Sequence, residues 1–82
     1  MTSYRYRAVV LEQLVAHGIM PTATTSPDLV HEYLNDLYRY ELRRLRGRLL
    51  DGEIRKENYY GRVVELRRKY GLLSIRRTEW IE

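Results

Sequence analysis

The chain has 82 residues, no cysteine and a formal net charge of +4. The absence of cysteine excludes disulfides and thiolate metal sites, and the length predicts one domain near the lower size limit for an adequate core. No apolar run is long enough for a signal peptide or a membrane span, and the lack of cysteine favours a cytoplasmic location. We therefore expect a small cytoplasmic protein, with no membrane contact, that supplements its core by self-association or by binding a partner.

The first helix is predicted over residues 3–17, with Thr2 or Ser3 as its cap. Its apolar side is expected to contain Tyr6, Val10, Leu11, Leu14 and Val15. The sequence His17-Gly18-Ile19 is typical of a Schellman ending, because glycine accepts the left-handed conformation that follows the last helical turn. Residues 18–26 contain Pro21 and a run of small polar residues without periodicity, so they are predicted to form a loop.

The second helix is predicted over residues 27–51. It starts at Ser26-Pro27-Asp28, which supplies a capping oxygen, a proline at the first helical position and an acid in the first turn. It ends at Asp51-Gly52, which places a glycine just past the last turn. Apolar residues recur between these ends at spacings of three or four, or twice that, at Val30, Leu34, Leu37, Leu45 and Leu49.

The third helix is predicted over residues 56–70, since Tyr59, Val63, Leu66 and Tyr70 follow one another at steps of four, three and four. The short connection between the second and third helices leaves no room for a long excursion, so we expect an antiparallel helical hairpin. We therefore predict an all-α fold: a three-helix small domain built on this hairpin, followed by an ordered C-terminal arm.

The turn between the second and third helices contains Gly52-Glu53-Ile54, and Tyr59 and Leu66 follow it five and twelve positions after the isoleucine. In this pattern residues 45–70 resemble the SHOCT family of short helical hairpins. The family usually places Thr or Ser after the isoleucine, where this chain has Arg55. The resemblance implies an accessory interaction or oligomerisation module without catalytic residues.

Two glycines lie inside the predicted hairpin helices, at positions 47 and 61. Each costs roughly 1 kcal/mol of helix propensity relative to alanine, so a compensating role is expected. One hypothesis is that Gly47 and Gly61 allow the close approach of the other helix or of a tyrosine ring. The alternative is that both glycines are exposed.

The C-terminal arm, residues 71–82, carries four aliphatic residues and the single tryptophan, Trp80. A disordered tail does not ordinarily contain so much apolar surface, so the arm is expected to be ordered. Folding back over the helices is favoured, and docking on another subunit is the alternative.

Basic residues concentrate between residues 39 and 77, where eleven arginines and two lysines stand against five acids. One interpretation is a nucleic-acid-binding face formed by Arg43, Arg46, Arg55, Lys56, Arg62, Arg67, Arg68 and Lys69. However, acids are interleaved and the basic residues occupy several sides of their helices, so the favoured interpretation is a set of solvated helix faces.

A tyrosine and arginine face of the second helix, together with the arm, is the predicted partner-binding surface. Within it, Glu41 falls where the apolar pattern calls for a leucine, so its carboxylate is either buried with a basic partner or located at the rim. The partner could be Arg44, three residues along, or an arginine from the third helix, the arm or another subunit. The partner-binding candidates are Tyr33, Tyr40, Glu41, Arg44, Arg48, Arg76, Arg77 and Trp80.

Catalytic and metal-binding patterns are incomplete in this sequence. His31-Glu32 lacks the second histidine of a zinc-protease helix, the serines have no evident base, and the glycines form no phosphate loop. We therefore expect no enzyme activity, no catalytic or metal-ligating residue, no cofactor and no small-molecule substrate. The predicted function is a protein-interaction module, either a homo-oligomer or part of a larger complex; the alternative is nucleic-acid binding.

Overall fold

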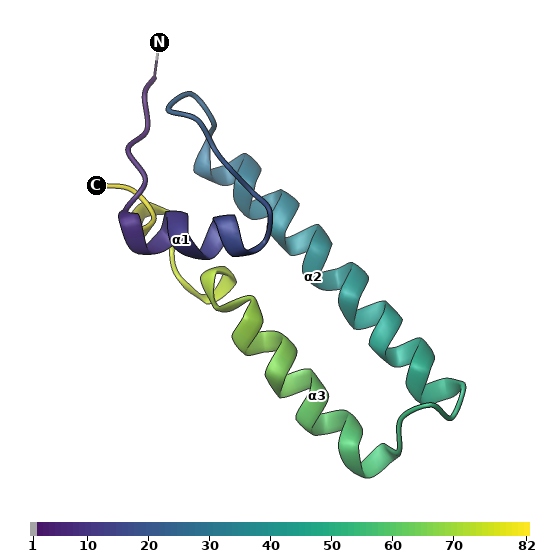
Figure 1. Cartoon of the computed structure of the whole chain (residues 1–82). Helices are drawn as coiled ribbons and strands as arrows, with labels where there is room; N and C mark the ends of the chain where they lie inside the picture. Colours follow the sequence, from purple (N-terminus) through teal and green to yellow (C-terminus); the bar gives the residue numbers. More distant parts are fainter. Residues whose placement is uncertain (1) are drawn as a thin grey trace.

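In the computed structural model, which describes residues 2–82, three α-helices are followed by two short 3₁₀-helices (Figure 1). The α-helices are α1 (Ala8–Ala16), α2 (Pro27–Leu50) and α3 (Lys56–Lys69), and the 3₁₀-helices are η1 (Gly71–Ser74) and η2 (Arg77–Glu79). The described residues form no named strand, and one isolated antiparallel bridge joins Tyr6 to Ile81. The predicted all-α fold is confirmed.

Helices α2 and α3 form the predicted antiparallel hairpin, and local sequence explains both ends of α2. The Ser26 Oγ accepts a hydrogen bond from the Asp28 N–H at 3.2 Å, and Pro27 occupies the first turn. At the other end Gly52 has a φ of 79°. The N–H groups of Gly52 and Glu53 donate to the carbonyls of Leu49 and Arg48, which completes a Schellman motif.

Helix α1 begins at Ala8, so the prediction that residues 3–7 are helical is wrong. The backbone of this segment pairs with distant parts of the chain instead. The Tyr4 N–H donates to Ala23, the Arg7 N–H donates to Trp80, and the Arg5 carbonyl accepts from the Glu82 N–H. The N-cap is Arg7, without a side-chain hydrogen bond, so neither Thr2 nor Ser3 has the predicted capping role.

The end of α1 has the predicted Schellman geometry. Gly18 has a φ of 76°, and the N–H groups of Gly18 and Ile19 donate to the carbonyls of Val15 and Leu14. Val15 itself was expected on the buried side of this helix, but 55% of its surface is exposed. The apolar side of α1 is therefore narrower than the sequence pattern predicts.

The core lies at one end of the molecule, where the N-terminal segment, α1, the first half of α2 and the C-terminal arm meet. The core cluster consists of Tyr6, Val10, Leu14, Val30, Leu34, Tyr70, Leu72 and Trp80. Trp80 has no exposed surface. The arm is thus ordered and folds back on its own chain, as favoured from the sequence.

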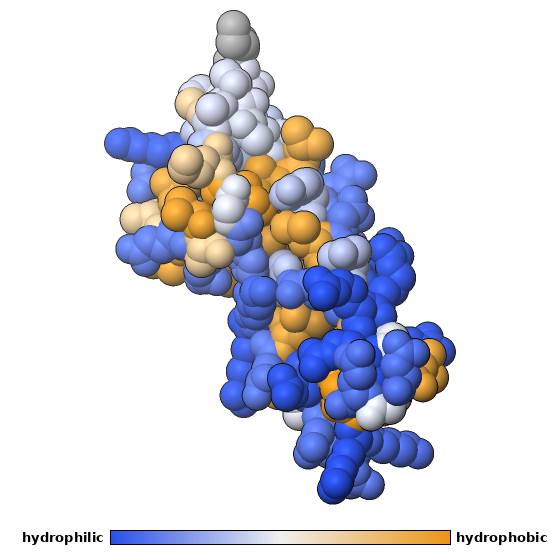
Figure 2. All heavy atoms as spheres, turned by 45° about the vertical axis from the view of Figure 1, so that its right-hand side comes forward, coloured by the Kyte–Doolittle hydropathy of each residue, from blue (hydrophilic) through white to orange (hydrophobic). Residues whose placement is uncertain are grey.

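The hairpin extends away from this core, which gives the molecule dimensions of 51 × 18 × 17 Å (Figure 1). No residue of α3 is fully buried, and the buried apolar side chain in this half of the molecule is that of Ile54, in the turn. Figure 2 shows hydrophilic side chains surrounding hydrophobic ones along this extension. The outer half of the hairpin is therefore held mainly by half-buried contacts between two helices.

The internal glycines do not permit a close approach. A Cβ atom added to Gly47 or Gly61 would meet no heavy atom within 4 Å, and neither residue has a positive φ. We therefore expect Gly47→Ala and Gly61→Ala each to raise the free energy of unfolding by about 0.5–1 kcal/mol, measured by urea denaturation. Gly52→Ala is the control, and it should destabilise the protein because Gly52 has a positive φ. If either Gly47→Ala or Gly61→Ala lowered the free energy of unfolding, the space around that glycine would not be open.

Candidate protein-interaction surface

The outer side of α2 carries an exposed apolar stripe formed by Leu29, Tyr33 and Tyr40. Their exposed fractions are 61%, 55% and 53%. Separations of four and seven residues place them on one side of a helix with 3.6 residues per turn, well away from Val30 and Leu34 in the core. Tyr33 and Tyr40 were predicted from sequence. Leu29 was missed, although it lies one turn before Tyr33 and could have been found by extending the stripe.

Arg44 belongs to the same side of α2. Its guanidinium carbon lies 5.9 Å from the centre of the Tyr40 ring, within the range of a cation–π contact. Arg44 makes no ion pair with a described residue. The three predicted partner-binding residues Tyr33, Tyr40 and Arg44 therefore lie on one solvent-exposed side of the helix, where each presents a flat or planar group to solvent.

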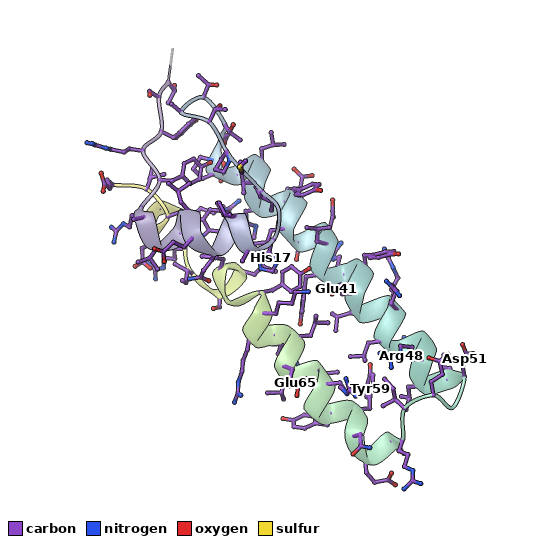
Figure 3. All side chains as sticks on the ribbon, viewed as in Figure 1. His17, Glu41, Arg48, Asp51, Tyr59 and Glu65 are labelled. Carbon is purple, nitrogen blue, oxygen red and sulfur yellow. The ribbon has the colours of Figure 1, made fainter. Side chains whose placement is uncertain are left out.

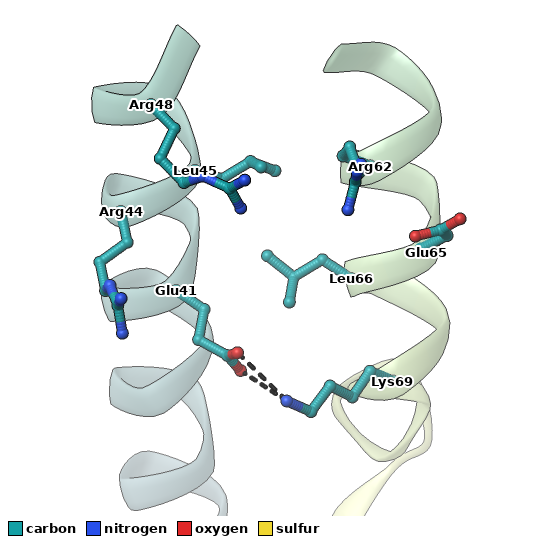
Figure 4. Close-up of a pocket in the computed structure, with 8 residues that line it drawn as sticks. All are labelled: Glu41, Arg44, Leu45, Arg48, Arg62, Glu65, Leu66 and Lys69. Atoms are coloured by element: carbon teal, nitrogen blue, oxygen red, sulfur yellow. Dashed lines mark hydrogen bonds and ion pairs between the residues drawn. The ribbon is translucent and has the colours of Figure 1, made fainter. Parts of the chain in front are cut away.

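A groove runs between α2 and α3 on another side of the hairpin (Figure 4). Leu45 and Leu66 point toward each other across it, and Arg48 and Arg62 point into the space beside them. It is lined by Glu41, Leu45, Arg48, Arg62, Glu65, Leu66 and Lys69, and Arg44 lies at its edge next to the outer side of α2. Arg48 is engaged by Glu53 at 3.2 Å, whereas Arg62 makes no ion pair with a described residue. The groove is open and mostly polar, and its charges of both signs do not converge on one point.

Glu41 lies at the end of this groove and joins the two helices (Figures 3 and 4). Its carboxylate accepts hydrogen bonds from the Lys69 Nζ, at 3.1 and 3.3 Å, and from the Tyr70 hydroxyl. Its side chain is 32% exposed, so it occupies a half-buried rim position with a basic partner from α3. Arg44, the neighbour considered from sequence, does not contribute. Glu41 therefore holds α2 and the end of α3 together within the chain.

A second contact secures the same junction from α1. The His17 ring stacks on Tyr70 with 4.5 Å between ring centres, and its Nε2–H donates to the Lys69 carbonyl at 2.9 Å. Burial, followed by the hydrogen bond to Glu41, raises the pKa of the Tyr70 hydroxyl, which remains protonated and can donate. His17, Glu41 and Tyr70 thus connect α1, α2 and α3.

Partial burial raises the pKa of Glu41, but the hydrogen bonds from Tyr70 and Lys69 outweigh it, so this pKa lies below its ordinary value. A depressed carboxyl pKa stabilises the fold above the unfolded pKa of about 4.3, and this contribution is lost as the pH falls through the folded pKa. We expect Glu41→Gln to lower the free energy of unfolding by about 1 kcal/mol at pH 6, with a smaller difference at pH 3. Urea denaturation measures both. Glu65→Gln, also in the groove, is the control, and an equal effect of both substitutions would contradict this assignment.

Trp80 was a partner-binding candidate, and the structure contradicts that role because its side chain is completely buried in the core. Its indole N–H has no hydrogen-bond partner among the described residues. The other two candidates of the arm are exposed. Arg77 pairs with Asp28 at 3.2 Å, at the start of α2, whereas Arg76 makes no ion pair with a described residue. The structure therefore does not join the arm and the tyrosine stripe into one binding surface.

The basic residues considered for nucleic acid are all exposed but do not share one side of the hairpin. Arg62 and Lys69 line the groove of Figure 4, whereas Arg67 and Arg68 line a separate hollow with Tyr38 and Val64. Arg55 and Lys56 lie at the turn end, and Arg43 and Arg46 lie on α2. These residues surround the hairpin instead of forming a continuous strip.

Other features of the described residues define no further site. They contain no group of three or more His, Asp or Glu side chains placed to hold a metal ion. None of their helices combines the length and the apolar character needed to cross a membrane. Comparisons with protein-family models, curated proteins and solved structures give no match. The resemblance of residues 45–70 to SHOCT hairpins therefore stays a prediction.

Proposed function

We propose that this chain is a non-enzymatic protein-interaction module and that the outer side of α2 is its docking face. The observation that carries the proposal is the exposed stripe of Leu29, Tyr33 and Tyr40 on a long, regular helix. Tyrosine combines a large apolar ring with a polar edge and loses little conformational entropy, so it is enriched at protein interfaces. Arg44 beside Tyr40 adds a residue type that interfaces also favour.

The shape of the molecule supports this proposal. The core anchors the first half of α2 from one side, while the opposite side remains exposed along its length. A docking face on a helix that is fixed from behind requires little reorganisation on binding, which lowers the entropic cost of association.

Nucleic-acid binding by the basic residues is the alternative proposal. Its support is the number of exposed arginines without an intramolecular ion pair among the described residues. Electrostatic binding of a phosphate backbone is strongest when cations lie along one strip, and here they lie on several sides of the hairpin. The tyrosine stripe therefore supports the first proposal better.

Photo-cross-linking tests the two proposals in the organism that makes the protein. Benzoylphenylalanine is introduced at position 33 or 40, and as the control at position 60 of α3, where the tyrosine is even more exposed. We expect protein adducts from positions 33 and 40, whether to a second copy or to another chain, and at least about tenfold fewer from position 60. Adducts to nucleic acid, or equal yields from all three positions, would contradict the docking face.

A further inference from the structure

The charges beside the tyrosine stripe change sign halfway along α2. Acidic residues occupy the first half of this outer face, at Asp28, Glu32 and Asp36, and basic residues occupy the second half, at Arg39, Arg43 and Arg46. All six are exposed. Asp28 pairs with Arg77, and the other five make no ion pair with a described residue. This face therefore carries opposite charges in two separate blocks, and apart from Asp28 these charges are not paired with another described residue.

The two blocks are related by an inversion of the sequence about a point between Leu37 and Tyr38. Asp36 and Arg39 are equally far from this point, and so are Glu32 and Arg43. Asp28 and Arg46 are placed almost evenly about it, and Tyr33 and Tyr40 lie on opposite sides of it, with Tyr40 the nearer. When two identical helices lie antiparallel across a twofold axis at this point, each acidic block faces the basic block of the other copy. A parallel arrangement would instead place like charges opposite each other.

We propose that the partner of the docking face is a second copy of this chain, packed antiparallel along α2 across a twofold axis. The inference rests on the proposed function, and it adds the identity of the partner and the direction of its helix. A twofold interface uses the same patch on both subunits, so the patch must complement itself. The stripe of Leu29, Tyr33 and Tyr40 supplies the apolar contact, and the charge blocks fix the orientation and disfavour the parallel alternative.

Helix α2 has the length that such an interface needs. Its 24 residues span about 36 Å, so two antiparallel copies would contact each other over several turns. The core packs on the other side of α2, and thus the dimer can form without any change in the described fold. The two hairpins would then point in opposite directions from the axis.

Charge exchange between the blocks tests the proposal. One full-length variant, Glu32→Arg with Asp36→Arg, makes the central part of the face basic, and the other, Arg39→Glu with Arg43→Glu, makes it acidic. By sedimentation equilibrium we expect a wild-type dimer and self-association at least about tenfold weaker in each variant, because like charges then meet across the axis. An equimolar mixture of the two variants should associate again as a heterodimer, because all facing charges become opposite in sign.

Controls separate this result from a general effect of charge. Arg67→Glu with Arg68→Glu, on α3, changes the net charge as much as Arg39→Glu with Arg43→Glu does and should leave the dimer intact. Circular dichroism should show unchanged helix content in every variant. The antiparallel dimer would be overturned if either charge variant alone still formed a dimer as stable as that of the wild type. It would also be overturned if the equimolar mixture of the two variants did not associate. A wild-type chain that stays monomeric would also overturn it, whereas heterologous protein adducts at positions 33 and 40 would then still support the docking face.

Discussion

Replacing Trp80 by alanine is expected to lower the free energy of unfolding by about 3–5 kcal/mol. A domain of 82 residues has a total stability of only about 4–12 kcal/mol, so this single change removes a large fraction of it. Trp80 is completely buried, its ring lies 5.6 Å from that of His31 on α2, and its carbonyl accepts from the Arg7 N–H. It therefore connects the arm, the N-terminal segment and α2, and its loss leaves a cavity where they meet.

Urea denaturation followed by far-ultraviolet circular dichroism measures this effect. Trp80→Phe is the matched variant, because it keeps an aromatic ring and removes the indole N–H that has no hydrogen-bond partner among the described residues. We expect it to retain at least half of the stability that alanine loses. If Trp80→Ala costs less than about 1 kcal/mol, the tryptophan is not part of the core, and its original assignment to the partner-binding surface would have to be reconsidered.

The features of the fold that were predicted correctly depend on short stretches of sequence. Ser26-Pro27-Asp28 determines the start of α2, and Gly18 and Gly52 determine the ends of α1 and α2 through hydrogen bonds within a few residues. Predicted ends for α2 and α3, at residues 51 and 70, lie within one residue of Leu50 and Lys69. Capping residues and apolar periodicity within a few residues were therefore sufficient to predict these helix ends.

Errors occurred where contacts between distant residues decide the structure. Residues 3–7 have a helical pattern of side chains, yet their backbone groups pair with Ala23, Trp80 and Glu82, and none of these partners is visible in the local sequence. Similarly, the hypothesis that Gly47 and Gly61 mark a close contact assumed a helix-to-helix distance that residue types do not determine. The sequence also suggested several partners for Glu41, and only the register of α3 selects Lys69 and Tyr70.

The candidate surface was predicted in part. Tyr33 and Tyr40 lie on one exposed side because their separation of seven residues is a property of any α-helix. The role of Trp80 could not be decided, since an apolar arm can be buried equally well against its own helices or against another chain. The structure shows the first case. The proposed docking face therefore narrows to α2 itself, where the side of the helix determines whether a side chain is buried in the core or exposed.

Leu34→Ala is expected to lower the free energy of unfolding by about 3–5 kcal/mol, whereas Leu45→Ala, on the same helix, should cost only about 1 kcal/mol. Leu34 has no exposed surface and belongs to the core cluster, but Leu45 is half-buried beside the groove between the hairpin helices. The substitutions are chemically identical and remove similar helix propensity, so the difference measures burial alone. Urea denaturation at low protein concentration excludes any contribution from association.

The comparison also tests how stability is distributed along α2. A large cost at Leu34 and a small one at Leu45 would mean that the core holds the first half of α2 rigidly, while the outer half of the hairpin opens at a lower free energy. Tyr33 lies in the rigid half and Arg43 in the outer half. An antiparallel partner would place its own rigid half against the outer half of the first copy, so each copy would stabilise the weaker part of the other. If Leu34→Ala and Leu45→Ala lowered the free energy of unfolding equally, the core would not be confined to one end of the molecule. The antiparallel arrangement would then have no such advantage.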